Sequence, residues 1–210
     1  MYSNQKGFTL IEIMVSLVVT LVIVAGAYAV FAIQNKSANV QNEVATMQQN
    51  GRIAMDVLVE EIRRGAYNNP ANPAGATITV DASGSMITIQ KDVNDDGVIN
   101  DTLASSADDE EWIVLQVNGN NQLTKQILRK SDGSDVQTLI LADNIYSLSF
   151  SPAGVTDPSS VDISLTVRTK HEDPNWTDTN KGVNLSGSVS DGLARIRNYQ
   201  KTVWVRNLNL

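Results

Sequence analysis

A short acidic segment in the middle of the chain carries oxygen ligands at the spacing of a calcium-binding loop. The segment from Asp92 to Asn100 reads DVNDDGVIN. In such a loop, oxygens at positions one, three, five, seven and nine bind the ion, and a glycine at position six permits the sharp turn. These positions are occupied by Asp92, Asn94, Asp96, the Val98 carbonyl and Asn100, with Gly97 at position six. The spacing therefore predicts calcium binding.

The glutamate that usually closes a calcium loop is missing from this segment. Position twelve is Leu103, where calcium loops carry a bidentate glutamate. Asp101 or the cluster Asp108–Glu111 could supply the last ligand. The other interpretation is an Asx-rich turn, in which the side chains cap nearby amides. Both interpretations stay open at this point, so no cofactor is certain and calcium is the candidate.

A second carboxylate stands out because it interrupts the most apolar segment of the chain. Phe8–Ile33 is a run of 26 residues in which Glu12 is the one charged residue. At about 1.5 Å per helical residue the run reaches roughly 39 Å, enough to cross a hydrocarbon core of about 30 Å. A carboxylate at the centre of such a helix costs about 2.5–3.5 kcal/mol. We therefore expect Glu12 to pair with a positive charge inside the membrane.

Two simpler interpretations of the apolar run are a secretory signal and a plain membrane anchor. Lys6 precedes the run, and Ala25-Gly26-Ala27 is typical of a signal-peptidase site. Neither interpretation accounts for an acid at the fifth residue after a Gly7–Phe8 junction.

Composition argues against catalysis and against general nucleic-acid binding. His171 is the single histidine and there is no cysteine, so the usual nucleophile and metal sets cannot be assembled. We expect no enzyme. The net charge of −7 disfavours nucleic acid as a partner. A basic stretch with Arg195, Arg197 and Lys201 is the sole support for a DNA-binding role, and it also reads as a strand with solvent-facing cations.

The elements that must position these residues are one long helix and a β-rich domain. No proline occurs from Gln34 to Arg64, and apolar residues recur there at a helical period, so the helix is predicted to end near Gly65. Hairpin turns are predicted at Gly84-Ser85 and Asn118-Gly119. The predicted strands are Thr77–Val80, Met86–Gln90, Trp112–Val117, Gln122–Arg129, Thr138–Ala142, Ile145–Ser151, Val161–Arg168 and Thr202–Arg206, with a long loop over His171–Leu193. This order predicts an α+β fold in which the helix packs on antiparallel β-sheet.

The start of the apolar run resembles the signal of type IV pilin-like proteins. The residues Lys6-Gly7-Phe8-Thr9-Leu10-Ile11-Glu12 match it in register. The resemblance implies that a prepilin peptidase cuts between Gly7 and Phe8 and methylates the new amino terminus of Phe8. It also implies that Glu12 pairs with the amino terminus of a neighbouring subunit. The expected domains are a leader (1–7), the transmembrane (8–33) and extramembrane (34–65) parts of the helix, and a β-rich globular head (66–210).

Later segments resemble minor pilins and pseudopilins of the PilW and GspJ type, with the pilin-like fold. The resembling segments are Gln49–Tyr67, Asp92–Gly97, Glu111–Val114, Gln126–Arg129, Leu141–Phe150 and Val203–Leu208. The implied protein primes assembly of a type IV pilus and sits at its tip. Its partners would be prepilin peptidase, other minor pilins and the major pilin, and it would cross the inner membrane once with an extracytoplasmic head. The alternatives are a type II secretion pseudopilin and a tip-displayed adhesin or DNA-uptake module.

Overall fold

A single long helix and two antiparallel sheets make up the described chain. The computed structural model describes residues 7–67, 75–93, 95, 97, 99, 111–128, 135–185 and 192–205. Helix α1 spans Leu10–Arg64, so it begins two residues later than the apolar run and ends where the sequence predicts. The chain forms two compact units, Met1–Glu43 and Val44–Leu210. The last third of α1 belongs to the second unit.

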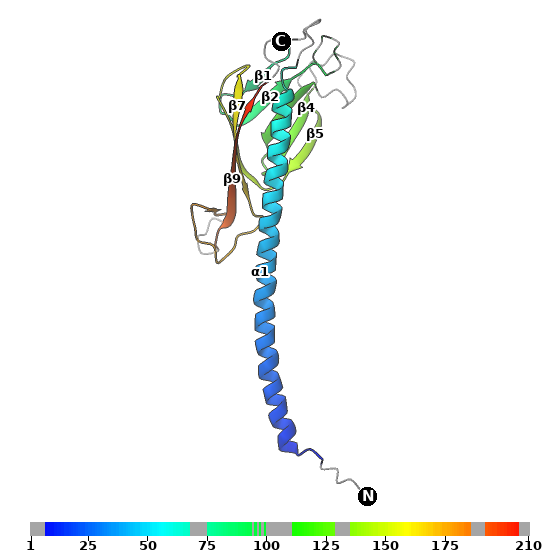
Figure 1. The fold of residues 1–210 in the computed structure, drawn as a ribbon, viewed down its shortest axis with the longest axis vertical. Coiled ribbons are helices and arrows are strands. Elements are labelled where there is room, and N and C mark those ends of the chain that lie inside the picture. Colours follow the sequence, from blue (N-terminus) through cyan, green and yellow to red (C-terminus); the bar gives the residue numbers. More distant parts are fainter. Residues whose placement is uncertain are drawn as a thin grey trace. The chain divides into compact units, whose positions relative to one another are not determined.

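The strands of the second unit form two sheets (Figure 1). Among the described residues, a five-stranded sheet has the order β1-β2-β3-β4-β5 and a four-stranded sheet has the order β6-β7-β9-β8, with every pairing antiparallel. The bounds are β1 Ile78–Val80, β2 Met86–Gln90, β3 Trp112–Val117, β4 Leu123–Leu128, β5 Asp135–Ala142, β6 Ile145–Ser151, β7 Ser160–Arg168, β8 Gly182–Val183 and β9 Ala194–Trp204. The predicted α+β class with antiparallel sheet is confirmed.

The last strands differ from the prediction. Strand β9 begins at Ala194 rather than Thr202, and the predicted loop over His171–Leu193 contains β8. From Arg195 to Thr202 no side chain of β9 is buried, so an alternating apolar pattern is missing there. The strand exists because its backbone pairs with β7 along that strand's whole length. Pairing partners of this kind leave no local signal in the sequence.

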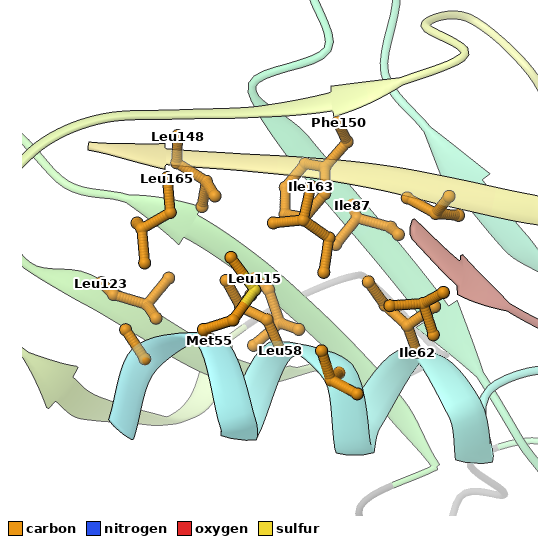
Figure 2. Packing of buried hydrophobic residues seen from close by; sticks show 14 of the residues in the cluster. Met55, Leu58, Ile62, Ile87, Leu115, Leu123, Leu148, Phe150, Ile163 and Leu165 are labelled. Atoms are coloured by element: carbon orange, nitrogen blue, oxygen red, sulfur yellow. The ribbon is translucent and has the colours of Figure 1, made fainter. Parts of the chain in front are cut away.

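The core lies between α1 and both sheets (Figure 2). Met55, Leu58 and Ile62 project from one face of α1 toward strand residues such as Leu115 and Ile163. Leu58 and Ile62 are fully buried, as the predicted apolar stripe requires. The predicted packing of the helix on antiparallel sheet is observed, and α1 meets residues of both sheets.

Gly51 permits α1 to approach the second sheet closely. A Cβ atom at this position would lie 2.4 Å from Cε2 of Tyr199 on β9, and the Tyr199 hydroxyl donates a hydrogen bond to the Gln48 carbonyl (3.2 Å). Alanine is better than glycine in a helix by about 1 kcal/mol. Contact with the Tyr199 ring explains why glycine nevertheless stands here.

A buried ion cluster joins α1 to the first sheet. The Glu61 carboxylate accepts hydrogen bonds from Nζ of Lys91 (3.0 Å) and from Nζ of Lys125 (2.6 Å), and all three residues are at most 9% exposed. Burial alone would raise the pKa of Glu61, but the Lys125 hydrogen bond and the charges of both lysines outweigh it and hold the pKa below 4.5. Glu61 is therefore charged at neutral pH.

We predict that Glu61→Gln strongly destabilises the head while Glu60→Gln does not. Removing one partner of a buried ion pair costs about 3–5 kcal/mol, because the remaining charges stay buried without compensation. Glu60 pairs with Arg64 on the surface, with its side chain 59% exposed, and such pairs contribute about 0.5 kcal/mol or less. Urea unfolding of the full chain in detergent, followed by tryptophan fluorescence, measures both. Equal losses in the two variants would contradict the assignment.

Acid should remove the stability that Glu61 contributes. Because the pKa of Glu61 is lower in the folded chain than its ordinary 4.5, this contribution is complete above pH 4.5 and is lost as pH falls through the folded value. Unfolding measured from pH 7 downward should show a steeper loss below pH 4.5 in the wild type than in Glu61→Gln. Parallel curves would show that another group controls the acid limb.

Candidate functional site

The junction between Gly7 and Phe8 lies in an exposed segment before the helix. Residues 7–9 have no regular secondary structure, and Phe8 is 86% exposed. No atom lies within 4 Å of a Cβ atom built on Gly7. A peptide bond in this conformation can be bound by a peptidase without unwinding α1.

Glu12 and Thr9 form a reciprocal cap at the start of α1. The N–H and the hydroxyl of Thr9 donate to Oε2 of Glu12 (2.9 and 2.8 Å), and the Glu12 N–H donates to the Thr9 hydroxyl (3.3 Å). This is a capping box, in which two residues three apart satisfy each other's amides. The role of Thr9 was not predicted, although the Thr-x-x-Glu spacing is the signal of a capping box. The cap holds the Glu12 carboxylate at the amino end of the helix, four residues from Phe8.

The helix after Glu12 presents an apolar surface on all sides. Large side chains from Leu10 to Ile33 are more than half exposed. The hydroxyls of Ser16 and Thr20 donate to the carbonyls four residues earlier, those of Glu12 (2.6 Å) and Ser16 (2.7 Å), so these two polar groups are satisfied within the helix. Among the described elements, α1 is the one helix long and apolar enough to cross a membrane. By length and composition, such a surface is suited to a membrane.

Two described residues of the Asp92 loop have left-handed backbone conformations. Asp95 and Gly97 have φ values of +61° and +80°, and the Gly97 N–H donates to Oδ2 of Asp92 (3.1 Å). The Asp95 carboxylate accepts a hydrogen bond from the Tyr67 hydroxyl (3.2 Å) and thereby raises the pKa of Tyr67 above 10.0. Of the predicted calcium ligands, Asp92 is described, whereas Asn94, Asp96, Val98 and Asn100 lie outside the described residues.

Clusters of metal-ligating side chains were searched for in the part of the chain that the structure describes. No group of three or more His, Asp or Glu side chains is placed there to hold a metal ion. Asp108, Asp109 and Glu110 of the acidic cluster lie outside the described residues. Trp204 lies on β9 and is 68% exposed.

Two family comparisons match the two units. The prokaryotic N-terminal methylation motif matches residues 2–28, and the family described as prepilin peptidase-dependent protein B matches residues 41–204. Among solved structures, a type IV-like pilin from Thermus thermophilus is similar over 77% of this chain and 97% of its own, with 11% identity and a TM-score of 0.42. A search of curated proteins found no match. Because the second family match covers most of the chain and the first covers the start of α1, the chain belongs to the prepilin peptidase-dependent protein B family of type IV pilin-like proteins.

Proposed function

We propose that this chain is a minor pilin that primes assembly of a type IV pilus and sits at its tip. Prepilin peptidase would cut between Gly7 and Phe8, and the Phe8 amine would then be methylated. The observation that carries the proposal is one continuous helix, α1, with a capped carboxylate at its amino end, an apolar surface after it and a folded head at its other end. Such a helix is suited to assembly, because its apolar part needs lipid or other helices around it.

Glu12 is the residue that makes assembly directional. In the unassembled chain its carboxylate accepts neutral hydrogen bonds from Thr9. An incoming amino terminus offers a charged donor, and charge-assisted hydrogen bonds are about twice as strong as neutral ones. The low dielectric of the membrane strengthens this preference. During insertion, the amine of a neighbouring subunit would therefore replace Thr9 as the hydrogen-bond donor to the Glu12 carboxylate.

The head would face the extracytoplasmic side of the inner membrane. Cleavage after Gly7 takes place on the cytoplasmic side in pilin-like proteins, so a single crossing by residues 8–33 leads the rest of α1 and the head outward. Other minor pilins and the major pilin are the proposed partners. A type II secretion pseudopilin would use the same membrane chemistry, so the two roles are separated by genetics rather than by this geometry.

The contacts of the basic stretch argue against a DNA-binding or adhesive tip module. The Arg195 guanidinium donates to Oδ2 of Asp173 (2.8 Å) and stacks on Trp176, 4.2 Å from the ring centroid. Arg197 lies 5.9 Å from the centroid of the Tyr199 ring. These contacts engage Arg195 within the head, which leaves less of the stretch for phosphate.

We predict that Glu12→Gln blocks incorporation into the filament while leaving cleavage and methylation at Phe8 intact. Glutamine keeps the shape and a carbonyl acceptor for Thr9 but loses the charge that an amino terminus requires. The matched control is Thr9→Ala, which removes the hydroxyl cap, at a cost of about 1 kcal/mol, and keeps the charge. Mass spectrometry of the amino-terminal peptide reports processing, and immunoblots of sheared filaments report incorporation. Normal incorporation of Glu12→Gln, or a defect confined to Thr9→Ala, would contradict the pairing role.

We predict that deletion of the gene abolishes surface pili and leaves protein export unchanged. A priming subunit acts before the bulk of the filament is added, so its absence should leave no pili rather than shorter ones. Electron microscopy counts pili, and an assay of secreted proteins measures export. Normal pilus numbers would count against the proposal, and blocked export with intact pili would identify a pseudopilin instead.

A further inference from the structure

The four-stranded sheet has one face that points away from α1. Leu148, Phe150, Ile163 and Leu165 project from β6 and β7 toward the helix (Figure 2), so the residues between them project from the opposite face. The strand register places these outer residues in rows across β6, β7 and β9. The rows are Ser147, Thr166 and Asn198; Ser149, Ser164 and Gln200; and Ser151, Asp162 and Thr202. All of these residues are exposed or half-buried.

A hollow of about 380 Å³ lies on this outer face. It is lined by the six residues of the two rows that contain Ser164 and Asp162. Ile163 and Lys201 also line it, and they contribute backbone atoms, because their side chains alternate to the other face of the sheet. Ligand pockets in proteins have volumes of about 300–1,000 Å³. The hollow is therefore large enough for a small ligand group.

The polar groups in the hollow have unused hydrogen-bonding capacity. The Thr202 hydroxyl donates to Oδ1 of Asp162 and thereby orients the carboxylate. Within the described chain, Oδ2 of Asp162 accepts no hydrogen bond, and the side chains of Ser164 and Gln200 form none. Hydroxyl and amide groups both donate and accept, whereas a carboxylate only accepts. This combination suits a ligand whose own polar groups are hydroxyls, because a hydroxyl also does both.

An exposed indole ring stands at the end of the same face. Trp204 pairs with Ser160 in the row after that of Asp162 and Thr202, about 7 Å further along β9. Its neighbour Val203 is 1% exposed, whereas Trp204 is 68% exposed, so the ring projects from the outer face. Tryptophan usually gains much of its stabilisation from buried apolar area. Here the flat apolar ring remains available to a ligand beside the polar hollow.

The outer face is nearly uncharged. Asp162 is the one charged residue in the three rows. The cations of the basic stretch, Arg195, Arg197 and Lys201, alternate along β9 with the outer residues and so belong to the other face. The contacts that engage the basic stretch therefore do not involve this face. An anionic ligand would be repelled by Asp162 and by the net charge of −7, so an uncharged ligand fits best.

We propose that the outer face of β6, β7 and β9 binds a neutral oligosaccharide. A sugar ring carries hydroxyl groups around its edge and C–H groups on its faces, so it needs polar partners and a flat apolar surface together. Sugar hydroxyls would donate to Asp162 in charge-assisted hydrogen bonds, which are about twice as strong as neutral ones, and would accept from the Gln200 amide. Trp204 would stack on the face of the next ring. This inference goes beyond the proposed assembly role and does not depend on it.

The test uses the full chain in a detergent without a sugar headgroup, since a glycosidic detergent would compete for the site. The probes are soluble oligosaccharides of glucose, galactose, mannose, xylose and N-acetylglucosamine, with anionic oligogalacturonate for comparison. At least one neutral probe should bind in isothermal titration and shift tryptophan emission to shorter wavelength, because the Trp204 ring leaves water. Asp162→Asn, which keeps an acceptor for Thr202, and Trp204→Ala should each weaken binding about tenfold or more.

The matched controls remove the same kinds of group elsewhere in the head. Asp178→Asn removes a carboxylate from an exposed pair with Lys181, and Ile140→Ala removes a 59% exposed apolar side chain from β5 of the other sheet. Both should bind the probe as the wild type does. Circular dichroism checks that each variant is folded, and the wild-type titrations with the other site variant decide the outcome if one is not.

Three results would each overturn the proposal. They are no binding of any neutral probe at millimolar concentration, unchanged affinity in a folded Asp162→Asn or Trp204→Ala variant, and tighter binding of oligogalacturonate than of every neutral probe. None of these measurements involves processing or filament assembly, so their failure would leave the assembly role standing.

Discussion

Burial of the last third of α1 between two sheets is the contact on which the head depends. Leu58 and Ile62 are enclosed by strand residues of both sheets, so neither sheet has a complete core without the helix. At about 25 cal/mol per Å² of apolar surface, each such side chain contributes roughly 1.5–3 kcal/mol. The Glu61 cluster fixes the orientation of α1 in this packing, because its two ion pairs form at one rotation of the helix about its axis. Hydrophobic burial holds the helix in place, and the ion cluster selects its orientation.

The same helix meets two different physical requirements along its length. From Leu10 to Ile33 its large apolar side chains are exposed on all sides, which only lipid or other helices can satisfy. From Met47 to Ile62 only a stripe is buried, and the other face is polar. Glu12 is the exception within the first part, because it is charged. The Thr9 cap lowers the free-energy cost of its carboxylate by offering two hydrogen-bond donors. The proposed assembly role rests on that exception, since a capped carboxylate can exchange its partner.

Charge in the head is handled by enclosure rather than by exposure. Glu61 balances two lysines inside the core, Arg195 is held by Asp173 and Trp176, and Asp92 and Glu111 are buried beside a loop rich in acids. The Glu61 cluster is complete in the described chain, whereas Nε of Arg195 is buried without a hydrogen bond. Oδ1 of Asp92 is likewise buried without a hydrogen-bond partner among the described residues. In a domain without cysteines, such polar clusters join separate elements of the fold in place of disulfides.

Local chemistry alone determined much of this protein. The apolar run, the Gly7-Phe8 junction with Glu12, the hairpin turns at Gly84 and Asn118, and the α+β class all follow from periodicity and turn residues close in sequence. The roles of Gly7, Phe8 and Glu12 stay predictions. Tertiary structure decided the pairing of Glu61 with Lys125, 64 residues away, the length of β9 and the hydrogen bond from the Val93 N–H to the Glu111 carboxylate. These depend on which strands become neighbours, and contacts between distant residues leave no local pattern to read.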